Sequence, residues 1–162
     1  MHQPSPPPER SQTIRRAVGA DAAALSELAF RSKAHWGYDA AFMETCRGYL
    51  TLSAEELDTW PAYIVEIDGR PAGFYVLIVP GDGAAELDDL FVDPAAIGQG
   101  VGRRLWEHAV ATARAHGCRE IGFESDPHAE GFYLAMGAER IGEIASTAAP
   151  GRMLPLMRYR VT

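Results

Sequence analysis

The chain has 162 residues, 47% of them hydrophobic and 23% charged, and a formal net charge of −7 at neutral pH. This length suits one domain with a sizeable core. The acidic balance disfavours a nucleic-acid-binding surface, and no apolar run reaches the roughly 18 residues of a membrane span. Cys46 and Cys118 lie far apart and fit no metal-ligand spacing, so we expect a reducing compartment, no disulfide framework and no metal site.

The chain opens with a proline-rich segment, residues 1–11, which lacks the apolar core of a secretory signal. We expect it to be a flexible tail in front of a single domain, residues 12–162. Together with the absence of a membrane-spanning run, this composition predicts a cytoplasmic protein.

Hydrophobic periodicity and turn residues predict the elements of the domain. Asp21 is a good N-cap for the first helix, Asp68-Gly69 is typical of a two-residue hairpin turn, and Gly117 is a good C′ residue for the main helix. In chain order we predict strand 13–17, helices 22–32 and 39–50, a helical turn at 53–56, strands 63–67, 73–79 and 85–92, helix 100–115, strand 120–124, helix 127–136, and strands 138–144 and 153–161.

The junction between strand 85–92 and helix 100–115 is the most informative stretch. Gly98, Gly100 and Gly102 precede the helix, so free backbone N–H groups and close backbone approach predict an anion cradle. Arg103 and Arg104 in the first helical turn favour a bound diphosphate, because the helix dipole alone disfavours cations there. The stretch matches neither a Walker-type P-loop nor a dinucleotide fingerprint, since arginines follow the glycines.

Two motifs in this order resemble the GCN5-related N-acetyltransferases. Val92-Asp93-Pro94 with Gly98-Gln99-Gly100-Val101-Gly102 is similar to the family's acyl-coenzyme A signature, and Phe132-Tyr133-Leu134-Ala135-Met136-Gly137 is similar to its Phe-Tyr-x-x-x-Gly segment. The chain departs from the family at Ile97, where Arg or Gln is usual, and at Asp126, where Asn is common. The resemblance implies an α/β fold with a mixed, mostly antiparallel central sheet flanked by helices, in the order β-α-α-β-β-β-α-β-α-β-β.

The resemblance also implies acetyl-CoA as the cofactor. Its pantetheine arm is expected to pair with the strand end at Leu90, Phe91 and Val92, like an added strand. Its diphosphate is expected over the glycine turn and the helix start. The residues expected at the diphosphate are Gly98, Gln99, Gly100, Val101, Gly102, Arg103 and Arg104.

Aminolysis of a thioester needs a base for the amine and an acid for the leaving thiolate. The resemblance gives Tyr133 as the acid. We take Glu86 as the base, with Glu124 as its rival, although an ordinary exposed carboxylate would give the same pattern.

Strand alternation places Glu86, Asp88, Leu90 and Val92 on one face and Asp89 on the other. The segment 82–93 holds five acids and no base, which favours a cationic amine as the acceptor.

For the acceptor pocket we favour Trp36, Tyr38 and Glu124. Aromatic residues that merely cap the core would look the same. Further candidates for the lining are Lys33, Tyr49, Trp60 and Arg152.

The sequence thus predicts an acetyl-CoA-dependent N-acetyltransferase that transfers directly to a primary amine, on a small molecule or a peptide, in a ternary complex. The cysteines lie outside both motifs, which disfavours a cysteine relay. The alternatives are a coenzyme A-binding sensor without catalysis, a partner-binding protein that acts through its proline-rich tail, and O-acetylation or transfer of a longer acyl group. The family also allows a homodimer, although no pattern marks an interface.

Overall fold

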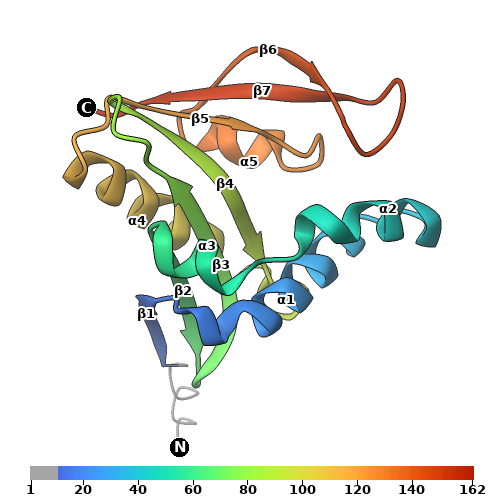
Figure 1. Cartoon of the computed structure of the whole chain (residues 1–162), viewed down its shortest axis with the longest axis horizontal. Coiled ribbons are helices and arrows are strands. Elements are labelled where there is room, and N and C mark those ends of the chain that lie inside the picture. The colour runs from blue at the N-terminus through green and yellow to red at the C-terminus, as the bar shows by residue number, and fades with distance from the viewer. Residues whose placement is uncertain (1–10) are drawn as a thin grey trace, which may run out of the picture.

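The computed structural model describes residues 11–162, so the predicted tail lies almost wholly outside the described residues. Its centre is a seven-stranded sheet in the order β1-β2-β3-β4-β5-β7-β6 (Figure 1). Only β4 and β5 run parallel, and every other neighbouring pair is antiparallel. The strands are β1 (Gln12–Arg16), β2 (Ala62–Ile67), β3 (Arg70–Ile78), β4 (Ala84–Val92), β5 (Glu120–Glu124), β6 (Glu139–Ala145) and β7 (Met153–Arg160).

The helices cover both faces of this sheet and give the protein two cores. One core packs the first three helices against Ile64, Phe74 and Val76, and the other packs the last two helices against Tyr75 and Leu77 on the opposite face. The helices are α1 (Ala22–Ala34), α2 (Ala40–Leu50), α3 (Ala54–Thr59), α4 (Val101–Ala115) and α5 (Glu130–Ala135).

The fold class and the element order predicted from the sequence are confirmed, with boundaries shifted by a few residues. The hairpin at Asp68-Gly69 is also confirmed, since both residues have positive φ, as its type of turn requires. Asp21 is the N-cap residue of α1, as predicted, but its carboxylate makes no capping hydrogen bond, because it accepts hydrogen bonds from Arg15 and from the Val18 amide. Helix α5 begins at Glu130, three residues later than predicted.

Strands β4 and β5 separate soon after they begin. They pair only from Ala84 to Glu86 and from Glu120 to Gly122, and Figure 1 shows them diverging beyond that point. The sheet is therefore open in its middle, between the second half of β4 and the end of β5. The backbone of β4 on that edge has no partner strand within residues 11–162.

A β-bulge at Asp88 overturns the expected faces of β4. Leu77 of β3 pairs with Leu87, and Val76 pairs with Asp89, so Asp88 is an extra residue in β4. Because one inserted residue shifts the alternation, the side chains beyond the bulge change faces relative to those before it.

The two cores show this shift directly. Ala85 and Leu87 lie in the α4 core before the bulge, and Leu90 and Val92 pack against that same core after it. Phe91 packs against the other core. Leu90 and Val92 therefore do not share a face with Glu86, contrary to the sequence-based expectation.

No helix within residues 11–162 is long and apolar enough to cross a membrane.

Helix α4 packs closely on β3 at Gly73, and a substitution there tests this contact. A Cβ on Gly73 would lie 2.8 Å from Val101 Cγ1 and 2.9 Å from the Phe91 carbonyl oxygen. We expect Gly73→Ala to lower the free energy of unfolding by about 1–3 kcal/mol, because backbone and core must shift. Urea denaturation measures this.

The matched control is Gly48→Ala on α2, where a Cβ meets nothing within 4 Å. It should stabilise the protein by about 0.5–1 kcal/mol, because alanine loses less backbone entropy in a helix. Equal stability of the two variants would contradict the close packing of α4 on β3.

Candidate active site

A cavity of about 910 Å³ occupies the opening between β4 and β5. Its wall includes β4 from Glu86 to Val92, the glycine turn before α4, the end of β5 and the start of α5. Residues of α1 and of the loop between β6 and β7 complete it. One continuous space therefore joins the glycine turn to the acidic stretch of β4.

The free edge of β4 offers backbone hydrogen-bonding groups to this cavity. The Asp93 amide donates to the Ala72 carbonyl oxygen of the β3 segment at 2.8 Å. Consecutive amides of a strand point to opposite edges, so the Leu90 and Val92 amides point away from β3 and toward the opening. An extended ligand can pair with these groups as a strand would.

The glycine turn and the start of α4 have the backbone geometry expected of the predicted anion cradle. Gly98 and Gly100 have φ of +86° and +76°, and a Cβ on either would meet nothing within 4 Å. Gly100 is the N-cap of α4 and provides no side-chain cap. The amides of Val101, Gly102 and Arg103 find no backbone acceptor within residues 11–162. These donors and the positive end of the helix dipole suit a diphosphate.

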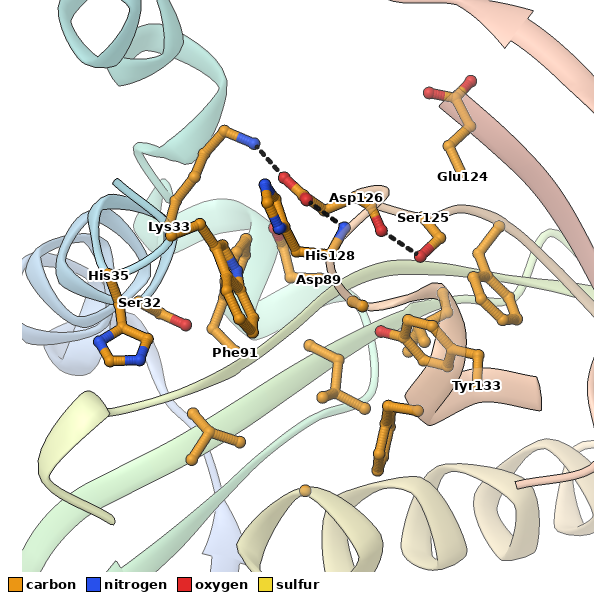
Figure 2. A pocket seen from close by; sticks show the side chains of 18 of the residues that line it. Ser32, Lys33, His35, Asp89, Phe91, Glu124, Ser125, Asp126, His128 and Tyr133 are labelled. Atoms are coloured by element: carbon orange, nitrogen blue, oxygen red, sulfur yellow. Dashed lines mark hydrogen bonds and ion pairs between the residues drawn. The ribbon is translucent and has the colours of Figure 1, made fainter. Parts of the chain in front are cut away.

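Tyr133 on α5 points its hydroxyl into the cavity (Figure 2). Its side chain is buried among Trp106, Phe123 and Phe132, yet its oxygen has no hydrogen-bond partner within residues 11–162 and is not sealed from the cavity. Burial, with the nearby charges of Asp89 and Asp126, raises the pKa of this phenol. Tyr133 therefore keeps its proton at neutral pH.

Three carboxylates meet at the bulge of β4. Oxygens of Glu56 on α3, Asp88 and Asp89 lie within 4.8 Å of one another. Burial and the neighbouring negative charges raise the pKa of Asp89 well above its usual range. No Lys or Arg side chain pairs with this group within residues 11–162, so its acids lie beside the cavity without a cationic partner.

Asp126, after β5, is the centre of a second cluster. Its carboxylate accepts hydrogen bonds from Lys33 Nζ at 3.0 Å, Tyr38 Oη at 2.8 Å and Arg152 Nη2 at 3.3 Å. Burial alone would raise the pKa of Asp126, but the His128 amide and Lys33 lower it below its usual value. Burial and Asp126 raise the pKa of Tyr38 to about 12. Lys33 thereby ties α1 to Asp126 in the β5–α5 loop (Figure 2), and Arg152 ties the β6–β7 loop to the same carboxylate.

The structure brings most of the predicted site residues to one cavity. Gln99, Arg104, Tyr38 and Trp60 are not part of its lining. Arg104 donates instead to Gln12 Oε1 at 2.9 Å, and the Gln99 amide group lies against the Ala95 carbonyl. The predicted residues that line the cavity are Lys33, Trp36, Tyr49, Glu86, Leu90, Phe91, Val92, Gly98, Gly100, Val101, Gly102, Arg103, Glu124, Tyr133 and Arg152.

Sequence reasoning missed two features of the site. Asp89 had been placed on the opposite face of β4 and given no role, because a bulge leaves no signal in an alternating pattern. Asp126 was noted only as a departure from Asn, and nothing local reveals partners as far along the chain as Lys33.

Comparison with known proteins agrees with this geometry. Residues 26–138 match the model of the Acetyltransferase (GNAT) family. The chain is 32% identical over 109 residues to the peptidyl-lysine N-acetyltransferase YjaB of Salmonella typhimurium, covering 65% of this chain and 70% of that protein.

Two solved structures share the fold. A GCN5-related N-acetyltransferase from Rhodopseudomonas palustris superposes with a TM-score of 0.76 at 20% identity, over 93% of this chain and 97% of that one. The acetyltransferase yncA of Salmonella typhimurium, solved with acetyl-CoA, superposes with a TM-score of 0.66 at 22% identity, over 94% and 95% of the two chains.

The lowered pKa of Asp126 predicts a pH-dependent contribution to stability. Some carboxyl groups have a lower pKa in the folded state than in the unfolded state. Such a group stabilises the fold at pH values above its unfolded-state pKa, and this contribution disappears as the pH falls through its folded-state pKa. Asp126→Asn should cost about 2 kcal/mol at pH 7. Urea titrations at successive pH values should show the difference from wild type closing below about pH 4.

Glu44→Gln is the control, because Glu44 pairs with Arg47 on the exposed face of α2. That substitution should change the urea midpoint little at any pH. If the difference in unfolding free energy between Asp126→Asn and wild type stayed the same at low pH, the ionisation assigned to Asp126 would be contradicted.

Proposed function

The chain belongs to the acetyltransferase (GNAT) family, and from this premise we propose that it transfers an acetyl group from acetyl-CoA directly to a primary amine in a ternary complex. The observation that carries the proposal is the cavity that joins the open edge of β4, the uncapped start of α4 and the Tyr133 hydroxyl. The acceptor is a small-molecule or peptide amine.

The donor would lie along β4 and α4. The amides of Leu90 and Val92 would hold its pantetheine arm, and the amides of Val101, Gly102 and Arg103 would hold its diphosphate. Arg103 lines the cavity at this end and adds positive charge. Bound acetyl-CoA would supply a thioester carbonyl as the electrophile.

Tyr133 would act as the general acid. Its buried, protonated phenol opens into the cavity without a competing hydrogen-bond acceptor within residues 11–162. A proton donated from this oxygen to the leaving sulfur would prevent an unstabilised thiolate from forming, which is where a general acid lowers the barrier.

Glu86 would accept the proton of the amine, directly or through water. It lines the cavity at the last position of β4 that pairs with β5, where these two strands separate. No Lys or Arg side chain pairs with it within residues 11–162. Glu124 lines the same cavity and is the second candidate for the base. The acidic group at the bulge would attract the amine in its cationic form.

Direct transfer is supported by the positions of the cysteines. Cys46 and Cys118 are buried in the cores and neither lines the cavity. An acyl-cysteine intermediate would need a thiol at the reacting atoms. The alternative function, a coenzyme A-binding sensor, would use the same cradle but has no need of an acid such as Tyr133.

Tyr133→Phe distinguishes these two functions. We expect release of free thiol from acetyl-CoA, measured against a panel of amines, to fall about 100-fold or more while coenzyme A affinity is unchanged, because only the acid is lost. Tyr159→Phe is the matched control, since Tyr159 packs on Trp106 outside the cavity, and it should keep full turnover. If wild type bound acetyl-CoA tightly but released no thiol with any amine, a coenzyme A-binding sensor would be favoured.

Gly100→Ala tests the cradle. A side chain there would face the space assigned to the diphosphate, so coenzyme A affinity measured by calorimetry should weaken about tenfold or more. Gly81→Ala is the matched control, because Gly81 also has a positive φ, +98°, and lies in a turn that does not line the cavity. It should lose stability to a similar degree but keep its affinity. Equal affinities of the two variants would remove the diphosphate from the start of α4.

A further inference from the structure

The second cluster, formed by Lys33, Asp126 and Arg152, carries an excess of positive charge. Lys33 and Arg152 contribute two positive charges to the second cluster and Asp126 contributes one negative charge, so one positive charge is left over. Both cations line the cavity. Glu124 also lines it, but forms no ion pair with either cation, and its carboxylate points away from Asp126 in Figure 2.

Arg152 keeps unused donors in this setting. Its side-chain hydrogen bonds, to Tyr38 Oη at 2.6 Å and to Asp126 Oδ2 at 3.3 Å, both use Nη2. Nε and Nη1 donate to no acceptor within residues 11–162, and neither is sealed from the cavity. A guanidinium presents its donors in a planar fork that matches a carboxylate.

The surroundings hold this guanidinium in place. Its central carbon lies 5.1 Å from the centre of the Tyr38 ring and 4.9 Å from that of Phe42. The side chain is only 18% exposed, so a bound anion would be screened little by solvent. The loop that precedes Arg152, residues 146–151, has no acidic residue, and its Ser146 and Thr147 line the cavity.

We propose that the acceptor is a small amino acid-like amine whose carboxylate binds to Arg152, with Lys33 adding positive charge. This inference rests on the proposed acetyl transfer and narrows its substrate class. The amine of such a molecule is drawn to the acidic stretch of β4, while its carboxylate meets the only unneutralised cationic cluster of the acceptor end within residues 11–162. A molecule with opposite charges at its two ends matches both parts of the cavity.

Binding of product analogues tests the proposal without any turnover. N-acetyl-L-amino acids and their carboxamides are titrated into the full-length protein by calorimetry, with and without coenzyme A. At least one carboxylate should bind about tenfold or more tightly than its own carboxamide, because a charge-assisted hydrogen bond is lost in the amide. If no carboxylate binds more tightly than its carboxamide, or none binds at all, the proposal is overturned.

Variants assign the preference to one side chain. Arg152→Gln should abolish the difference between carboxylate and carboxamide, and Arg152→Lys should retain part of it, because lysine keeps the charge but not the fork. Arg158→Gln is the matched control, since Arg158 pairs with Glu139 outside the cavity. A preference that survives Arg152→Gln would overturn the assignment.

The wild-type comparison decides the question even if Arg152→Gln does not fold. Failure of this inference is also distinguishable from failure of acetyl transfer. Loss of coenzyme A binding and of thiol release would refute the transferase, whereas equal binding of carboxylates and carboxamides would refute only the anionic acceptor.

Discussion

The site depends on one feature of the sheet, the early separation of β4 from β5. A strand in the middle of a sheet normally has both edges paired, and unpaired backbone groups away from water are costly. Here the second half of β4 pairs with β3 alone, and its other edge faces a cavity. The ends of the neighbouring elements β5, α4 and α5 meet around this opening. The glycine turn before α4, the Tyr133 hydroxyl and the acidic stretch of β4 therefore border one cavity.

Two parts of the cavity differ in the charged residues that line them. Uncompensated acids gather at the bulge of β4, and an excess of positive charge remains around Asp126. Because Asp126 ties α1 to the loops after β5 and before β7, the same ion pairs that close this side of the cavity also set its charge. Under the proposed acceptor, stability and specificity would be coupled at Asp126, whereas the proposed cradle would rely on backbone geometry and depend little on side-chain charge.

Local patterns sufficed for most of the fold and for the geometry of the glycine turn before α4. The glycines before α4 and the Phe132-Tyr133 pair are placed by nearby backbone and a short helix, so their sequence spacing carries the information. The bulge at Asp88 was beyond such reasoning, because an inserted residue keeps the same composition while it changes every face after it. The Asp126 cluster was also hidden, since its partners come from α1 and from the loop before β7. Arg104 shows the opposite kind of error. It belongs to the motif from which the diphosphate site was predicted, but its side chain hydrogen-bonds to Gln12 rather than facing the cavity.

Amide hydrogen exchange at β4, with and without coenzyme A, tests the central claim most directly. The account predicts that the Leu90 and Val92 amides become protected about tenfold or more when coenzyme A binds, because only they point to the open edge. The Asp89 and Phe91 amides, which face β3, should change little. Coenzyme A binding that leaves Leu90 and Val92 unprotected, or no binding at all, would contradict the donor site on β4.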